Sequence, residues 1–515
     1  MKKKTKNQLK MKKLLLLVLL SIISITAIQA QSAEITNVRR REFRGVFPIM
    51  NKATNEVKGY YTFYVNEKVG GGMVNFIVDI FDKELNLLKE TPITITKYSS
   101  VDGAEFNGTD FLFVFNDFMK KKLTYVTMDA DGEIIKQKVI TEEKRYAATA
   151  DVYTAQDGFF IVKPIKEKKW GYSIEKVDRE LNSLWEKSSM VEKGMVAVEA
   201  VEASTDRIVV IEVKKPTMMS SKATANLICL SDDSGEEIYN YPLYDGESTC
   251  MPSAFLIDKD NNVITGGMYF EGEIWDAVNS DGIFFLKLNA EGEKVSYSKE
   301  DWDKGIAAFI KNATAKSLTI GSKPKVIFEE IVETSDGNYR LIGETFKKNL
   351  SMVSIGKDAY IGDPNSDNNR QVYTFEIMDF ILFKYTSNAE LSNVSVIPKE
   401  HTKVLCYYPY NQIGGIRLAQ IVKDFGYFNF AFVTTLPEST EPLLVSKNFL
   451  DKEAYIGINT IDQEDNNEMH KIPINRKEFR GGSGGVMPCQ PGKVAVFTFS
   501  RKEQTINIYF EDIKL

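Results

Sequence analysis

The chain has 515 residues, of which 65 are basic and 71 are acidic, so its formal net charge is −6. An acidic balance argues against nucleic-acid and anionic-membrane partners, because both are bound through clustered Lys and Arg side chains. Its four cysteines are too few for a disulfide scaffold in a chain of this length.

The N-terminus has the pattern of a secretory signal peptide over residues 1–30. Seven lysines precede an apolar run that begins at Leu14, and small and polar residues follow up to Ala30. The apolar stretch is about a dozen residues, short of the roughly 20 that a membrane-spanning helix needs. We therefore expect cleavage between Ala30 and Gln31, export to the periplasm, outer surface or extracellular space, and no membrane insertion of the mature chain.

Cleavage would make the chain more acidic. It would remove seven of the 65 basic residues and none of the 71 acidic ones, leaving a net charge of −13. One basic cluster, Arg39-Arg40-Arg41 with Arg44, lies beside a predicted strand. We interpret it as a solvated sheet edge, since like charges on an edge discourage aggregation between sheets.

One strand type recurs from residue 76 to the C-terminus, each copy being an apolar strand followed by a polar turn. In several copies a second apolar strand comes before the recurring one, and this second strand itself follows Asp-Gly or a related turn, as in Asp336–Glu344. Two such strands in succession are the pattern of a β-hairpin. We count eight copies of the recurring strand: Phe76–Phe81, Leu123–Met128, Tyr172–Val177, Asn226–Leu230, Ile283–Leu288, Phe380–Tyr385, Glu453–Ile458 and Thr505–Phe510.

The repeat predicts an all-β fold, a single β-propeller over residues 31–515 with seven or eight four-stranded blades. The central strands are apolar on both faces, so they must be covered on both sides, as they are in radially stacked blades. The last blade lacks a fourth strand, and a strand within Glu34–Arg40 would supply it and close the ring. The alternative is two tandem β-domains divided near residues 300–325.

Two inserts interrupt the repeat. Residues 299–324 begin with a possible capping box and continue with Trp302, Ile306 and Phe309 at helical spacing, which predicts a surface helix over about residues 300–316. Residues 347–376 form a polar segment rich in Gly, Asn and Asp. Because long polar loops on rigid scaffolds often carry binding functions, both inserts are candidate specificity elements.

Chemical motifs are sparse. The oxygen-bearing side chains of Asp363, Asn365 and Asp367 alternate as in a calcium loop, but the central Gly and the final Glu are missing, so ordinary turn formation is the alternative. No other cofactor is expected. The two histidines, His401 and His470, belong to no catalytic motif, and the protein is more simply interpreted as a non-enzyme.

Aromatic residues give a second set of weak candidates. Trp302, Tyr407 and Tyr410 could stack on a ligand, although strand cores need aromatic residues as well. Cys229 and Cys250 could form a disulfide in an oxidising compartment, or they could be separate buried thiols.

The chain resembles a broad group of uncharacterised exported β-propeller-like proteins of Gram-negative bacteria. The resemblance rests on DGNYRLIGETF at Asp336–Phe346 and FILFKYTSNAEL at Phe380–Leu391, and it implies a fold without a function. We therefore expect a binding or scaffold protein that recognises a protein or glycan at a propeller rim. The alternative is a carboxylate-dependent glycoside hydrolase or polysaccharide lyase in the central channel.

Overall fold

The structure is a computed structural model, and it describes most of residues 32–515. The segments that it leaves out are 39–42, 52–55, 142–149, 167–169, 205, 218–219, 221, 275–279, 311–324, 352–358, 450–453, 462–468 and 476–482. The predicted signal peptide and the cluster Arg39-Arg40-Arg41 therefore lie outside the described residues.

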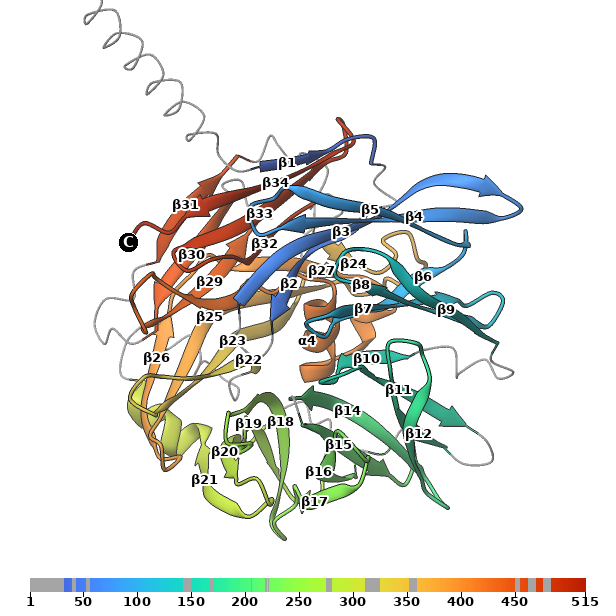
Figure 1. Ribbon diagram of the computed structural model, residues 1–515. Helices are drawn as coiled ribbons and strands as arrows, with labels where there is room; N and C mark the ends of the chain where they lie inside the picture. Colours follow the sequence, from blue (N-terminus) through green and yellow to red (C-terminus); the bar gives the residue numbers. More distant parts are fainter. Residues whose placement is uncertain are drawn as a thin grey trace, which may run out of the picture.

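Eight sheets are arranged in a ring, so the predicted all-β propeller is confirmed with eight blades (Figure 1). Their strands pair antiparallel, apart from one short parallel pair in blade 6. The region enclosed by the innermost strands is called the channel. The ring is continuous, and the alternative of two tandem β-domains is wrong. The first strand of each blade lies next to the channel and contacts the first strand of a neighbouring blade, as β14 does with β18 and β18 with β22. The fourth strand lies at the outer rim.

Blades 1 to 4 each consist of four consecutive strands. Blade 1 is formed by β2 (Phe43–Asn51), β3 (Glu56–Gly70), β4 (Met73–Asp82) and β5 (Leu87–Thr96), and blade 2 by β6 (Ser100–Phe106), β7 (Asp110–Asp117), β8 (Lys122–Asp129) and β9 (Ile134–Thr141). Blade 3 is formed by β10 (Asp151–Thr154), β11 (Phe159–Lys166), β12 (Trp170–Val177) and β13 (Ser183–Met190), and blade 4 by β14 (Met195–Ala203), β15 (Arg207–Lys215), β16 (Thr224–Ser231) and β17 (Glu237–Pro242).

Blades 5 to 8 include the enlarged blade 6 and the closing blade 8. Blade 5 is formed by β18 (Ser248–Ile257), β19 (Val263–Glu271), β20 (Gly282–Leu288) and β21 (Lys294–Asp301). Blade 6 is formed by β22 (Val326–Glu333), β23 (Tyr339–Leu350), β25 (Tyr373–Tyr385) and β26 (Leu391–Ile397), with β24 (Tyr360–Ile361) and β27 (Thr402–Cys406) added. Blade 7 is formed by β28 (Phe430–Thr435), β29 (Pro442–Asn448), β30 (Ala454–Thr460) and β31 (His470–Ile474), and blade 8 by β32 (Ser483–Pro488), β33 (Lys493–Ser500), β34 (Thr505–Asp512) and β1 (Ser32–Ile35).

An N-terminal strand closes the ring, as the sequence predicts, but that strand is Ser32–Ile35 and overlaps the expected segment Glu34–Arg40 only at its start. Strand β1 pairs antiparallel with β34, bringing Ile35 opposite Ile506, and so completes blade 8 with the N-terminal end of the described chain. Just beyond β1, the backbone N–H of Val38 donates to the carbonyl of Gln504 at 2.8 Å. The closure therefore satisfies backbone groups that an open sheet edge would expose.

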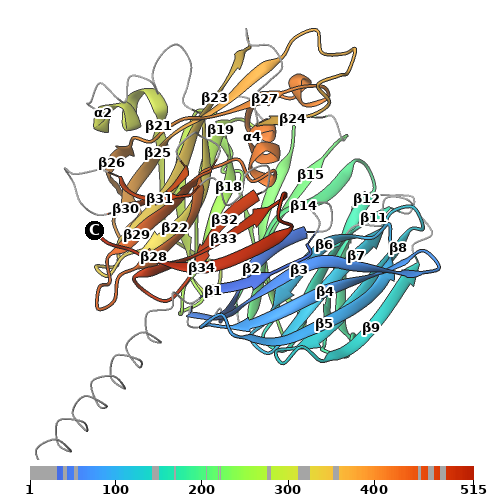
Figure 2. The same cartoon turned by 90° about the horizontal axis from the view of Figure 1, so that it is seen from above.

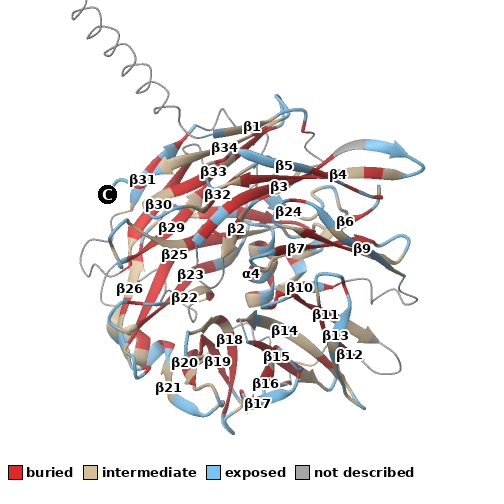
Figure 3. Ribbon diagram, in the orientation of Figure 1, coloured by how far each residue is buried: buried red, intermediate tan, exposed pale blue. Residues whose placement is uncertain are grey.

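The middle strands are buried on both faces because neighbouring blades pack against them (Figure 3). All eight residues of β7 are buried, for example, whereas β9 at the rim is mostly exposed. Aromatic rings join the blades: Phe63 of blade 1 stacks on Phe113 of blade 2 with ring centroids 5.6 Å apart. Phe43 of blade 1 likewise stacks on Phe499 of blade 8 at 5.0 Å.

The polar turns of the repeat are held by their first side chain. Asp82 Oδ1 accepts hydrogen bonds from the backbone N–H groups of Glu84 and Asn86, at 2.9 and 2.8 Å. The intervening Leu85 has φ +64° and is buried, so it enters the core from a left-handed conformation. Asp178 and Leu181 repeat the arrangement in blade 3. The turns thus fix the geometry at which one strand leads to the next.

The first insert differs from its prediction. The residues of the supposed capping box continue strand β21, which runs to Asp301, and no side chain caps the helical segment. A π-helical turn, Trp302–Ile306, is followed by the single turn α2 (Ala307–Phe309), so the described helix is much shorter than four turns. Residues 311–324 lie outside the described part of the chain.

The second insert is also more ordered than a polar loop. Strands β23 and β25 extend beyond blade 6, reaching Leu350 and starting at Tyr373, and carry a small sheet with β27 and β24. A short turn, Tyr410–Gln412, and helix α4 (Gly415–Asp424) follow. In Figure 1 α4 lies near the centre of the ring, and in Figure 2 it lies with β24 and β27 on one face of the ring.

Closure by the N-terminal segment is expected to contribute measurably to stability. Val38 is fully buried, so Val38→Ala should lower the free energy of unfolding by about 1–3 kcal/mol through lost packing. Leu87→Ala, at an exposed rim position, is the control and should change it by less than about 0.5 kcal/mol. Chemical denaturation measures both, and equal midpoints would contradict a stabilising role for the closure.

Candidate functional site

The channel wall is formed by strands that share an irregularity. Six of the eight innermost strands carry a β-bulge, in which one extra residue interrupts the pairing with the second strand. The extra residues are Arg44 in β2, Asp102 in β6, Glu199 in β14, Ser253 in β18, Glu329 in β22 and Ala431 in β28. Bulges redirect side chains, so this wall presents groups that a regular strand would point elsewhere.

Helix α4 covers one end of the channel beside blades 4, 5 and 6. Its buried face, Leu418, Ala419 and Val422, packs on the small sheet of the insert against residues such as Phe375 and Val404. The opposite face lines the channel with Ile416, Arg417, Gln420 and Lys423. The insert therefore holds the helix while leaving a largely polar face directed at the channel.

Two ion pairs, one of them fully buried, fix the insert to the ring. Lys423 Nζ of α4 lies 2.6 Å from Glu329 Oε2, the bulge residue of β22, whose side chain is 3% exposed. Burial raises the pKa of the Glu329 carboxyl, and Lys423 opposes that effect by stabilising the charged form. Lys399 lies 3.0 Å from Glu344 of β23, and both side chains are almost completely buried.

Glu344 also orders the chain that leaves the insert. Its carboxylate accepts hydrogen bonds from the backbone N–H groups of Asn429 and Phe430, at 3.1 to 3.2 Å. These residues follow α4 and lead into β28 of blade 7. The segment that leads from α4 into blade 7 is therefore held by the Glu344 carboxylate of blade 6. Removing one partner of the buried Lys399–Glu344 pair would lower the stability of the protein, because the other charge would be left buried and unpaired.

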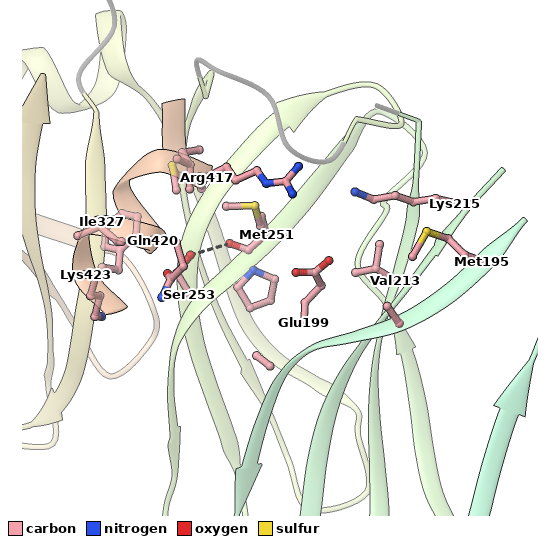
Figure 4. Close-up of a pocket in the computed structure, with 16 residues that line it drawn as sticks. Met195, Glu199, Val213, Lys215, Met251, Ser253, Ile327, Arg417, Gln420 and Lys423 are labelled. Carbon is pink, nitrogen blue, oxygen red and sulfur yellow. Dashed lines mark hydrogen bonds between the residues drawn. The ribbon is translucent and has the colours of Figure 1, made fainter. Parts of the chain in front are cut away.

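A cavity of about 550 Å³ lies between α4 and blades 4 to 6 (Figure 4). Its charged lining residues are Glu199, Lys215, Arg417 and Lys423. In Figure 4 Arg417 and Lys215 approach the same space from opposite sides, with Glu199 between α4 and β14. The apolar lining residues are Met195, Ala197, Ala200, Val213, Met251, Pro252, Met268, Ile327, Phe328 and Ile416.

The opposite end of the channel has a different character. A cavity of about 1060 Å³ is formed there by the C-terminal halves of inner strands such as β22 and β28 together with β3. Its charged lining consists of five carboxylates and two lysines: Glu56, Asp82, Glu84, Glu330, Glu333, Lys58 and Lys83. The end beneath α4 thus carries a positive excess, and this end carries a negative one.

Glu330 is the most perturbed acid of the acidic end. Burial raises the pKa of its carboxyl from 4.5 to about 7. Part of this carboxyl is therefore protonated near neutral pH, which is the state that a general acid requires.

The predicted aromatic residues occupy structural positions. Trp302 is buried in the core shared by blades 4 to 6, and its indole N–H donates to Ser280 Oγ at 2.8 Å. Tyr407 is buried as well and makes an edge contact with Tyr360. Tyr410 is half-buried and makes an edge contact with Phe425 at the end of α4.

The calcium candidate and the tyrosine segment lie together. The N–H of Asp363 donates to the carbonyl of Tyr408 at 3.0 Å, and Asn369 Oδ1 accepts from the N–H of Tyr408 at 2.7 Å. Asp363 Oδ1 accepts the backbone N–H of Asn365, as in an ordinary turn, and Asp367 is exposed. In the described chain no group of three or more His, Cys, Asp or Glu residues is arranged to hold a metal ion.

The cysteines are free thiols, so a bond between Cys229 and Cys250 is not formed in the structure. Both are buried, and burial raises the pKa of each thiol to about 11. Separately, none of the described helices is long and apolar enough to span a membrane.

Helix α4 is the element of the candidate site that the sequence did not predict. Its signal is short: two glycines, then Leu418, Ala419 and Val422 at helical spacing, then Gly426. The structure explains the final glycine, which ends the helix at φ +76° with its N–H donating to the carbonyl of Lys423. The bulges had no signal, because they depend on pairing between strands.

Comparison with known families adds one assignment. The chain matches the family described as "Family of unknown function (DUF6770)" over residues 11–514. The chain belongs to DUF6770. None of the curated proteins compared with it matches.

Solved structures resemble this member of DUF6770 only distantly. The WD40 domain of SCAP from fission yeast is 7% identical, with 94% of this chain and 98% of that chain covered and a TM-score of 0.40. An apocarotenoid oxygenase mutant from Synechocystis is 9% identical, with 52% and 63% covered and a TM-score of 0.31. A prolyl endopeptidase is 7% identical, with 90% and 54% covered and a TM-score of 0.40. These values carry no argument about function.

Ionisation of Glu330 at the acidic end of the channel is expected to lower the free energy of unfolding at high pH. Because the folded pKa of Glu330 is about 7 and its usual value is 4.5, the folded state holds the proton more tightly, and stability falls as the pH rises between these values. Glu330→Gln should therefore raise the free energy of unfolding by roughly 1–2 kcal/mol near pH 8 and change it little near pH 4.

The matched control is Glu333→Gln, an exposed residue of the same strand. Denaturation of both variants at the two pH values checks the expectation. A Glu330→Gln effect that is the same at both pH values would show that the carboxyl is not perturbed.

Proposed function

We propose that the protein is an exported β-propeller that works by binding, and that it holds a protein or glycan segment at the channel mouth beneath α4. The observation that carries the proposal is the cavity between α4 and blades 4 to 6. Apolar and charged groups converge there on a rigid ring, and a helix from an insert covers it. Clefts of this size that combine apolar walls with convergent polar groups are typical of ligand sites.

Binding fits this cavity better than hydrolysis does. Carboxylate-dependent glycosidases need two carboxyl groups within about 5 to 10 Å of each other, and Glu199 is the only carboxylate among the described residues that line the cavity. His401 offers no free base either. Its imidazole N–H groups donate to the carboxylates of Asp379 and Glu376, and these contacts, that with Asp379 above all, raise the pKa of the imidazole and favour its charged form.

A hydrolase or lyase remains the second candidate, at the opposite end of the channel. The observation in its favour is Glu330, whose raised pKa suits a general acid, in a cavity that also contains Glu56 and Glu333. Cleavage of a polysaccharide by the purified protein, abolished by Glu330→Gln, would support this candidate.

Export is part of the proposal and rests on the signal-peptide pattern of residues 1–30. Expression of the full chain in a Gram-negative host should give a mature protein that begins at Gln31. Intact-mass measurement and N-terminal sequencing of the non-cytoplasmic fractions test this. A full-length chain retained in the cytoplasm would contradict export.

Filling the cavity tests the binding site. Gln420 is exposed on the channel face of α4, so Gln420→Trp should block the cavity without disturbing the core. With defined panels of short peptides and oligosaccharides as probes, the wild type should bind at least one probe. The variant should bind that probe at least about tenfold more weakly, a loss of about 1.4 kcal/mol.

Gln137→Trp is the matched control, because Gln137 is exposed on β9 at the outer rim. It should bind like the wild type in fluorescence anisotropy and thermal-shift measurements. Unchanged binding by Gln420→Trp, or binding that Gln137→Trp weakens equally, would place the ligand elsewhere.

A further inference from the structure

We infer that the ligand beneath α4 is a peptide segment that carries a carboxylate next to apolar side chains. The inference rests on the proposed function and specifies the chemistry of the same cavity. Three features support it: an unpaired arginine, an apolar wall rich in methionine, and the opposite polarity of the two channel ends.

Arg417 is the recognition group. It is exposed on α4 and directed into the cavity, and within the described part of the chain it forms no ion pair (Figure 4). Lys423 differs, because Glu329 already neutralises it at 2.6 Å. A guanidinium presents a planar set of donors that matches a carboxylate in a two-point hydrogen-bonded pair.

The charge balance of the cavity favours an anion. Its lining includes three cations, Lys215, Arg417 and Lys423, and one carboxylate, Glu199. Lys423 is paired with Glu329, whereas Arg417 forms no ion pair with any described residue. A ligand carboxylate could therefore pair with Arg417 without displacing the Lys423–Glu329 pair.

The apolar wall favours a peptide over a sugar. Three methionines line the cavity, but Met268 is only 2% exposed, so Met195 and Met251 contribute the accessible surface, and methionine adapts its shape to different apolar side chains. Among the described lining residues Phe328 is the only aromatic one, and it is 1% exposed, so it offers no ring face for stacking. Carbohydrate sites usually present such a face, because aromatic rings combine an apolar body with a defined geometry.

The opposite charges of the two channel ends would also determine from which end an acidic peptide enters. The end opposite α4 is lined by five carboxylates against two lysines, so it repels the same anion. An acidic peptide is therefore favoured only on the face that α4 covers. This arrangement gives specificity through repulsion as well as through attraction.

The experiment uses the mature protein and four fluorescent probe sets. These are short acidic peptides rich in Leu and Met, the same peptides with Gln and Asn in place of Glu and Asp, neutral oligosaccharides, and uronate oligosaccharides. The acidic peptides should bind, the amide peptides should bind about tenfold more weakly or worse, and binding should weaken with added salt.

Charge reversal provides the decisive comparison. Arg417→Glu should weaken binding of the acidic peptides at least about tenfold. Arg501→Glu makes the same change at an exposed turn between β33 and β34 and should leave binding unchanged. A more conservative variant, Arg417→Gln, should show an intermediate loss and guards against a folding defect caused by the reversal.

The outcomes separate this inference from the proposed function. Binding of uronate or neutral oligosaccharides that Gln420→Trp abolishes would overturn the peptide assignment and keep the binding function. Equal affinity for acidic and amide peptides would overturn the role of the carboxylate. Binding of none of the four probe sets would contradict both the inference and the function on which it rests.

Discussion

The structure depends on one constraint, the burial of the middle strands on both faces. A strand such as β7, with all eight residues buried, cannot belong to a sheet that has one face exposed to solvent. Each blade therefore needs a neighbour on either side, and only a closed ring supplies one to every blade. The channel is a consequence of that closure, since the innermost strands converge around an axis without filling it.

The insert of blade 6 turns this general scaffold into a particular one. It extends β23 and β25 beyond the blade and places α4 over the channel. Lys423 of α4 pairs with the buried Glu329, and Lys399, which precedes β27, forms a buried pair with Glu344. Buried pairs contribute little net stability but are costly to break. The geometry of the channel mouth is therefore well defined, which suits a site that recognises a ligand without rearranging.

Much of the fold could be predicted from the sequence because it follows from local patterns. Apolar strands and polar turns such as Asp82–Asn86 are encoded by neighbouring residues, and their repetition indicated a ring. The number of blades became definite only with the structure, because the turns vary. The capping box before Trp302 was misleading, since pairing of β21 with β20 keeps those residues extended.

The candidate site was harder to predict because it arises from tertiary contacts. Arg417, Glu199 and Met251 come from three separate elements, and nothing in the sequence relates them. The bulge at Glu199 exists only relative to β15, its pairing partner. Glu344 ends the turn-and-strand segment Asp336–Glu344, and the sequence indicates only an ordinary strand residue there. In the structure its carboxylate accepts hydrogen bonds from the N–H groups of Asn429 and Phe430 and so anchors the insert.

The pairing of β1 with β34 has a consequence for how the ring folds. Ile35 and Ile506 are about 470 positions apart, so the contact that completes the ring joins two strands that are distant in the chain. Contacts of such high sequence separation form slowly. Until β1 pairs with β34, blade 8 presents an open edge that other chains could pair with. The ring is thus most vulnerable to aggregation in the interval before β1 is in place.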